Sequence, residues 1–269
     1  MNEEKTSANL ENNQPDSRQW ALVIGIGIVF LCGLAAFIFF GFQTYNRWTV
    51  AQNESATQVA ATSTSEVAER VRVIQETSRW PQLILDPFSE NVNEWMDGDI
   101  DDDYATMLLS INGRYIWDAV AKQGFIWRVW PRSDVVRDFY LTVEAQNLSD
   151  NLDAQYGLIF RNNEDGYFFL EVRDTQYFQV YSYANNEWTE LITSTYTEAI
   201  RPGGVNHLEI AAKDDVFYIV INNQFVGETT GSYPSRGQVG VAIGMSEAGE
   251  EAIIAFDNFE LRALETFEE

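Results

Sequence analysis

The sequence is short of cysteine, histidine and basic residues, and each shortage excludes a class of protein. Its single cysteine, Cys32, cannot form an intrachain disulfide, so any folded domain must be stabilised by burial of its core alone. The 17 basic residues face 41 acidic ones, and the net charge of −24 is unsuited to binding nucleic acid or an anionic lipid surface. The single histidine, His207, lies in a β-patterned segment, which is typical of a surface or packed residue rather than a catalytic base.

Charge is missing altogether from residues 20–42, which form one apolar stretch, WALVIGIGIVFLCGLAAFIFFGF. As a helix this stretch would extend roughly 34 Å, slightly more than the hydrocarbon core of a bilayer. We therefore expect a transmembrane helix over 20–42. Lys5 and Arg18 precede it and only Arg47 follows closely, so the positive-inside rule predicts a single-pass protein of the cell membrane with an extracytoplasmic C-terminal part.

Composition divides the rest of the chain. The polar residues 1–19 are expected to form a disordered cytoplasmic tail, and 265–269 a short acidic tail. Residues 43–79, rich in Ala, Thr, Ser, Glu and Gln, are expected to form a polar stalk that leads to a domain over 80–264. Small and β-branched residues in the stalk have the spacing of a coiled-coil seam, which predicts either a weak homo-oligomer contact or a solvated helical or flexible spacer. They are Thr57, Ala60, Thr64, Val67, Val71 and Ile74.

The domain from Trp80 onward is dense in aromatic residues and in short β-patterned runs separated by turn signals. Expected strands are 105–111, 114–120, 125–130, 135–146, 155–161, 166–173, 176–183, 187–193, 205–212, 215–221, 224–229, 237–244 and 252–262. Asn112-Gly113 and Asn222-Asn223 are expected hairpin turns. So many antiparallel strands in a domain without cysteine predict an all-β fold, a two-sheet antiparallel jelly-roll sandwich.

A series of short motifs occurs in order along this domain. They are Asp86-Pro87-Phe88-Ser89 with Trp95, Asn112-Gly113-Arg114-Tyr115, Tyr156-Gly157-Leu158-Ile159-Phe160-Arg161, Gly166-Tyr167-Phe168-Phe169, Val220-Ile221-Asn222-Asn223-Gln224, Gly237-Gln238-Val239-Gly240-Val241-Ala242 and Phe256-Asp257-Asn258-Phe259. Over about residues 83–262 this order resembles the concanavalin A-like lectin/glucanase jelly rolls, particularly the laminin-G-like and keto-disaccharide-hydrolase-like branch. The resemblance implies a fold but not an activity, because the same sandwich carries lectins, glycosidases and inert spacers.

Hydrolysis of a glycosidic bond needs two carboxylates placed across it. Glucanases of this superfamily carry Glu-x-Asp-x-x-Glu on one strand, and no segment here matches that pattern. Glu171 and Asp174 have the wrong spacing, and Glu209 stands alone. A carbohydrate-active hydrolase of the keto-disaccharide type stays open through the resemblance, without assigned catalytic residues.

Strand alternation predicts a sheet face that suits sugars. Aromatic rings stack on the C–H faces of a sugar, and charged side chains bind its hydroxyl groups. The expected ligand-binding residues are Arg161, Tyr167, Glu171, Arg173, Tyr177 and Tyr181. The alternative is a solvent-exposed sheet that cross-strand aromatic pairs merely stabilise.

Alternating aspartates at Asp97, Asp99, Asp101 and Asp103 are candidate oxygen ligands for Ca²⁺, although the run does not match an EF-hand and also suits a solvated acidic loop. Taken together, the sequence predicts a membrane-anchored surface protein whose non-catalytic jelly-roll domain binds glycan or another extracellular ligand. The alternatives are the hydrolase and a structural or assembly subunit that makes only protein contacts.

Overall fold

The computed structural model describes residues 65–268. The expected tail 1–19, the expected transmembrane segment 20–42 and the stalk as far as residue 64 lie outside these residues. Within 65–268, no helix is long and apolar enough to cross a bilayer.

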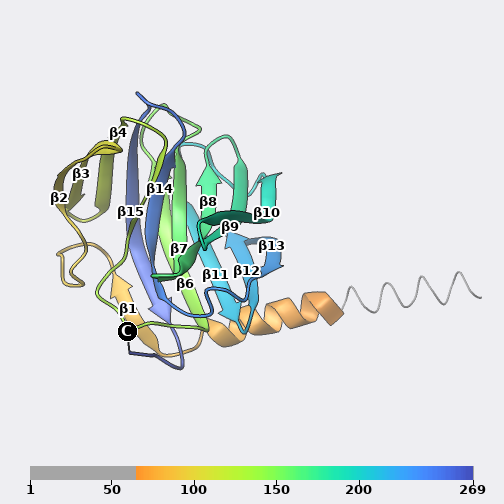
Figure 1. The fold of residues 1–269 in the computed structure, drawn as a ribbon. Helices are drawn as coiled ribbons and strands as arrows, with labels where there is room; N and C mark the ends of the chain where they lie inside the picture. The colour runs from red at the N-terminus through yellow and green to blue at the C-terminus, as the bar shows by residue number, and fades with distance from the viewer. Residues whose placement is uncertain (1–64, 269) are drawn as a thin grey trace, which may run out of the picture. The chain divides into compact units, whose positions relative to one another are not determined.

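The described chain is all-β apart from a helix over 65–77, and its strands form two antiparallel sheets packed face to face (Figure 1). The strands are β1 (Gln82–Asp86), β2 (Gly98–Asp101), β3 (Ala105–Ile111), β4 (Tyr115–Ala121), β5 (Phe125–Val129), β6 (Phe139–Asn147), β7 (Gln155–Asn163), β8 (Gly166–Arg173), β9 (Tyr177–Ala184), β10 (Glu187–Tyr196), β11 (Asn206–Lys213), β12 (Val216–Ile221), β13 (Gln224–Thr230), β14 (Gln238–Met245) and β15 (Glu251–Arg262). The predicted two-sheet sandwich is confirmed.

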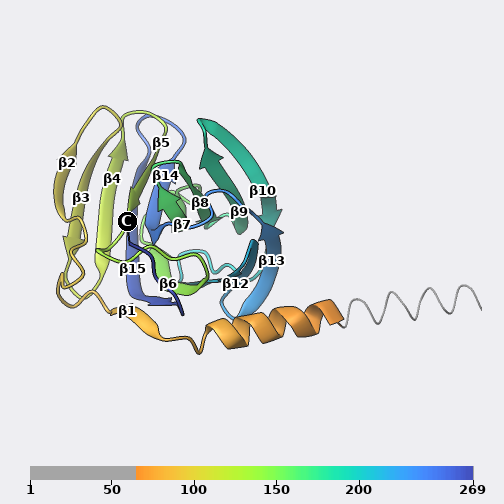
Figure 2. The same cartoon turned by 60° about the horizontal axis from the view of Figure 1, so that its bottom comes forward.

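The larger sheet has nine strands in the order β13-β12-β11-β6-β15-β4-β3-β2, with β1 added beside β15. The smaller sheet has six strands in the order β10-β9-β8-β7-β14-β5. Figure 2 shows β10 and β13, the edge strands of the two sheets, side by side at one border of the sandwich. In the smaller sheet β7 to β10 follow one another in the chain, whereas β14 and β5 join them from distant segments. This sheet carries the candidate site.

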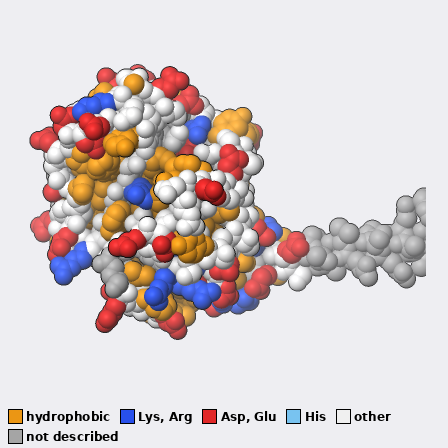
Figure 3. Space-filling view, viewed as in Figure 1, with side chains coloured by type: hydrophobic (Ala, Val, Ile, Leu, Met, Phe, Trp, Pro, Cys, Tyr) orange, Lys and Arg blue, Asp and Glu red, His pale blue; other side chains and the backbone are white. Residues whose placement is uncertain are grey.

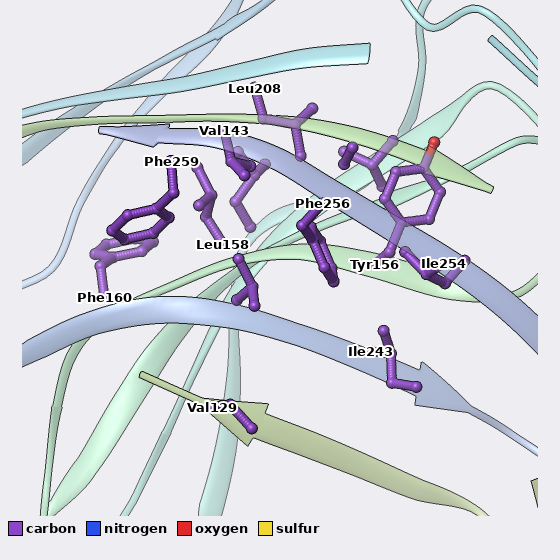
Figure 4. Close-up of a cluster of buried hydrophobic side chains, with 14 of the residues drawn as sticks. Val129, Val143, Tyr156, Leu158, Phe160, Leu208, Ile243, Ile254, Phe256 and Phe259 are labelled. Carbon is purple, nitrogen blue, oxygen red and sulfur yellow. The ribbon is translucent and has the colours of Figure 1, made fainter. Parts of the chain in front are cut away.

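The core fills the space between the two sheets (Figure 4). Its apolar residues occupy alternate positions along each strand, because successive side chains of a strand point to opposite faces. Strand β8 follows the sequence prediction, with Phe168, Leu170 and Val172 all buried in the core. Phe160 stacks on Phe168 with ring centres 5.2 Å apart.

Two short strands were not predicted. β1 follows the helix directly, and β2 falls inside the aspartate run that the sequence indicated to be a loop or a calcium site. β2 pairs with β3 along its whole length, from Gly98 opposite Leu109 to Asp101 opposite Thr106. Its acidic sequence is possible in a strand because β2 is the outermost strand of its sheet and its side chains reach solvent.

The last turns of the expected stalk belong to the folded unit. Val73 is only 2% exposed and packs with Ala211 and Tyr218 on the outer face of the nine-stranded sheet. The Arg70 Nε lies 3.3 Å from an oxygen of Glu228 on β13. Figures 1 and 2 show the helix lying along the outside of this sheet. The folded domain thus includes this helix and begins before Trp80, the residue at which the sequence analysis placed the start of the domain.

The predicted hairpin turns are present. Asn222 and Asn223, between β12 and β13, both have positive φ, at 51° and 64°. Gly113, between β3 and β4, has φ of 71°. Asparagine and glycine tolerate this left-handed conformation better than other residues, which is why the sequence predicted the turns.

Candidate ligand-binding face

The face of the six-stranded sheet that points away from the core is the candidate site. The register between β8 and β9 sets Tyr167 opposite Tyr183 and Glu171 opposite Gln179. It likewise sets Arg173 opposite Tyr177. Tyr167, Glu171, Arg173, Tyr177 and Tyr181, all named from sequence alternation, therefore lie on one sheet face as neighbouring strand positions.

Much of this face is covered by a residue that sequence reasoning missed. Trp188 on the edge strand β10 lies 4.6 Å from the ring centre of Tyr183 and 5.1 Å from that of Tyr181. Tyr167 meets it edge-on at 6.0 Å. As a result Tyr167 and Tyr181 are only 4% and 6% exposed, while Trp188 itself is 54% exposed. The accessible aromatic surface is thus mainly that of Trp188.

The middle of the face is hollowed by small residues on β14. Val239, Val241 and Ile243 point into the core, so Gly240, Ala242 and Gly244 occupy the opposite face. A Cβ on Gly240 would lie 2.2 Å from the carbonyl oxygen of Val129, and one on Gly244 would lie 2.5 Å from Oε1 of Gln155. The backbone contact requires glycine at position 240, whereas the Gln155 side chain near Gly244 could move aside. Positions 240, 242 and 244 of β14 therefore carry no long side chain on this face.

Arg128 uses the space above β14. It sits on β5 opposite Ala242, and its guanidinium carbon lies 4.0 Å from the ring centre of Tyr167 on β8. Strands β14 and β7 separate these two strands. Its NH1 donates a hydrogen bond of 3.2 Å to Oδ1 of Asn162. The arginine is thereby held across the hollow by a cation–π contact and a hydrogen bond.

A cavity of about 430 Å³ lies beside this arginine. It is lined by Gly124, Phe125, Ile126, Arg128, Gln155, Tyr167, Tyr183, Trp188 and Met245. Two adjoining cavities of about 310 and 450 Å³ also have Arg128 and Trp130 in their walls. The chain therefore presents a run of open space with aromatic walls and one cation where the cavities meet.

Glu171 is the buried carboxylate of the face, and it is fully engaged. Its Oε1 accepts a hydrogen bond of 2.6 Å from Nε of Arg173, and its Oε2 accepts one of 2.8 Å from Nε2 of Gln179. Burial raises the pKa of Glu171, and Arg173 opposes this shift without cancelling it. The pair Glu171–Arg173 is a packed ion pair rather than a pair of free ligand-binding groups.

Arg161, expected on this face, is not there. A bulge in β7 between Phe160 and Asn163 and a φ of 50° at Arg161 turn the side chain away, and it is wholly buried. Its guanidinium donates to the carbonyl oxygens of Arg137 and Asp214, and it lies over the ring of Phe217. Burial lowers the pKa of Arg161 to about 10. The residue joins backbone segments and presents no surface to a ligand.

Tyr177 and Arg173 lie at the other end of the face from Trp188. Tyr177 is 41% exposed and meets Tyr196 edge-on at 5.8 Å. Of the set named from sequence, Tyr167 and Tyr181 are thus covered beside Trp188, Glu171 and Arg173 form an ion pair, Arg161 is buried elsewhere, and Tyr177 is exposed.

The aspartates do not converge. Asp101 accepts a hydrogen bond of 2.5 Å from Nζ of Lys122 and another from Thr106. Lys122 holds the pKa of Asp101 below its usual range. Among residues 65–268, no three His, Cys, Asp or Glu side chains are grouped to hold a metal ion. Calcium binding at Asp97, Asp99, Asp101 and Asp103 stays a prediction that this arrangement does not support.

His207 lies elsewhere, on β11 of the nine-stranded sheet opposite Glu144. Burial lowers the pKa of His207, and the neighbouring Glu144 and Glu260 oppose that shift. It has no geometric connection with the six-stranded sheet face.

No family model matches the sequence, and no curated protein matches it. Among solved structures, a GlcNAcα1-4Gal-releasing endo-β-galactosidase from Clostridium perfringens has a TM-score of 0.51 at 11% identity, covering 68% of this chain and 62% of that one. The carbohydrate-binding module CBM66 from Bacillus subtilis gives 0.48 at 16% identity, covering 63% and 95%. The catalytic domain of an endo-1,3-β-glucanase (laminarinase) from Thermotoga petrophila gives 0.47 at 10% identity, covering 68% and 98%.

At these identities only the fold is shared. The likeness to the endo-β-galactosidase is one of fold, in line with the two-sheet sandwich that the sequence predicted.

Proposed function

We propose that the domain is a non-catalytic glycan-binding module whose ligand lies on the outer face of the six-stranded sheet. The observation that carries this proposal is Trp188, half exposed at the rim of the 430 Å³ cavity and braced by Tyr181 and Tyr183. A rigid, partly exposed indole is suited to stacking on the apolar face of a sugar ring. The polar groups of Gln155 and Arg128 in the same cavity can bind its hydroxyl groups.

Binding is favoured over hydrolysis by the composition of the cavity. Its lining within residues 65–268 contains no Asp or Glu, whereas glycosidases need an acid and a second carboxylate across the scissile bond. Glu171 is already bound by Arg173 and Gln179.

We also propose that residues 20–42 anchor the protein in a membrane as a single span and that the domain is displayed outside. The support is the uncharged length of this segment and the excess of Lys5 and Arg18 on its N-terminal side.

The test is a glycan array probed with the full chain in a non-ionic detergent, followed by affinity measurements on the retained glycans. Trp188→Ala should weaken binding by about 1–2 kcal/mol, roughly five- to thirtyfold, because it removes the stacking surface. Tyr233→Ala is the matched control, since Tyr233 is 46% exposed and lines none of these cavities. Absence of any retained glycan, or release of shortened glycans from the array, would contradict the proposal.

A further inference from the structure

Arg128 is an unneutralised cation in a strongly acidic protein. The chain carries a net charge of −24, and Figure 3 shows Asp and Glu side chains spread over the visible surface with hydrophobic side chains gathered between them. Several other partly buried arginines of the described residues have carboxylate partners, as Arg173 has in Glu171 and Arg262 in Glu260, whereas Arg114 bonds to the amide oxygen of Gln146. Arg128 forms no ion pair with any carboxylate of residues 65–268.

The guanidinium is nevertheless held in a fixed place. Its contacts within the described chain are the face of Tyr167 and the amide oxygen of Asn162. Tyr167 is itself packed against Tyr183 at 5.8 Å and buried, so the platform under the arginine is rigid. A guanidinium has five N–H donors in one plane, and only one of them is used by Asn162. Donors therefore remain for a ligand, in an orientation that is already set.

The position of Arg128 gives these donors access to open space. It is the residue common to three neighbouring cavities, among them the cavity of about 430 Å³ beside Trp188 and Tyr183. A planar guanidinium fork matches the two oxygens of a carboxylate or a sulfate group, which an ammonium group does not.

We propose that the ligand is an acidic glycan, in which a carboxylate or sulfate group pairs with Arg128 while a neighbouring sugar ring stacks on Trp188. This inference rests on the proposed glycan-binding function and names the class of sugar. The ligand carries isolated rather than dense charge, because Asp97 lines the adjoining 450 Å³ cavity and would repel a second anion close to the first. Glu94 in the same cavity is paired with Arg132 at 2.9 Å and adds less to this repulsion.

The first test compares ligands on the unaltered full chain in a non-ionic detergent. An array is printed with neutral glycans, glycans bearing one uronate, their carboxyl-reduced forms, glycans bearing one sulfate ester, and heparin as a dense polyanion. Retention of singly acidic glycans, with loss of signal after carboxyl reduction or desulfation, is the expected result. The carboxylate and sulfate arms identify which source supplies the anion.

The second test changes the arginine. Arg128→Gln should weaken binding of the best singly acidic glycan roughly tenfold or more, because a charge-assisted pair is lost, and should weaken binding of its reduced form much less. Arg128→Lys keeps the charge but not the fork, so it should recover only part of that loss. Arg201→Gln removes the same charge from an exposed loop that lines none of these cavities, and it should bind as the unaltered chain does.

The outcomes separate this inference from the proposed function. Retention of neutral glycans alone, equal binding of acidic glycans and their reduced forms, or strongest binding of heparin would overturn the acidic ligand while glycan binding stands. Retention of no glycan would overturn both. A variant that fails to fold leaves the comparison of ligands on the unaltered chain as the deciding measurement.

Discussion

The side-chain nitrogen of Lys213 donates a hydrogen bond of 2.6 Å to Oε1 of Glu76, joining strand β11 to a helix 137 residues earlier in the chain. Lys213 also holds the pKa of Glu76 below its usual range. Both side chains are partly exposed, so the pair itself adds little stability. The ion pair holds the end of the helix against β11, beside the buried contact of Val73 with Ala211 and Tyr218.

The first prediction concerns this helix. Val73→Ala should lower the free energy of unfolding by about 1–3 kcal/mol, because it removes buried methyl groups and leaves a small cavity under the helix. Val71→Ala is the matched control, since Val71 is 45% exposed while Val73 is 2% exposed. Urea denaturation of the full chain in a non-ionic detergent measures both variants. Equal effects of the two substitutions would mean that the helix does not pack on the sheet in solution.

The second prediction concerns pH and Glu209, which lies on β11 and is 6% exposed. Burial raises the pKa of Glu209, and its hydrogen bond with Tyr140 only partly opposes this. The native state therefore holds the Glu209 proton more tightly than the unfolded chain does. Its contribution to stability is present below the unfolded-state pKa and is lost as the pH rises through the native pKa.

Glu209→Gln has no such titration. At about pH 4 the melting temperature of the variant should be close to that of the unaltered chain. Towards about pH 8 it should exceed that of the unaltered chain by a growing margin. Glu187→Gln, on the exposed strand β10, should show no such trend. A melting difference for Glu209→Gln that stays constant with pH would contradict the raised pKa.

Strand alternation was sufficient to predict which side chains of β8 and β9 share a face. Successive side chains of a strand point to opposite faces, so this assignment depends on local sequence alone. It could not predict that Trp188 covers Tyr181, or that Arg128 reaches Tyr167, because those contacts depend on strand order and on the small residues of β14. A tryptophan inside an expected strand was the available signal for Trp188.

Arg161 was misplaced for a different reason. Simple alternation places the Arg161 side chain on the other sheet face from Phe160. A bulge, however, adds a residue to β7 and redirects the side chain. β2 was missed because its four residues are mostly acidic or glycine, and pairing with β3 outweighs their low strand propensity.

The third prediction follows from the corrected position of Arg161. Arg161→Met should lower the free energy of unfolding by about 3 kcal/mol or more, because the carbonyl oxygens of Arg137, Gly231 and Asp214 lose their donor. Glycan affinity of the folded fraction should not change. Arg201→Met, at an exposed position, is the control and should alter stability by less than about 0.5 kcal/mol. Chemical denaturation with a parallel binding measurement distinguishes this role from a ligand contact.

The fourth prediction concerns topology. Since Lys5 and Arg18 outnumber Arg47 around residues 20–42, protease added to intact cells that express the full chain should remove the domain and leave an N-terminal stub in the membrane. An N-terminal tag should stay protected until the cells are lysed. Replacing Lys5 and Arg18 by Gln leaves Arg47 as the nearest flanking basic residue, so a fraction of the chains should then invert and their domain become protected. A domain that resists protease in intact cells expressing the unaltered chain, and is cleaved only after lysis, would show that the orientation is the reverse.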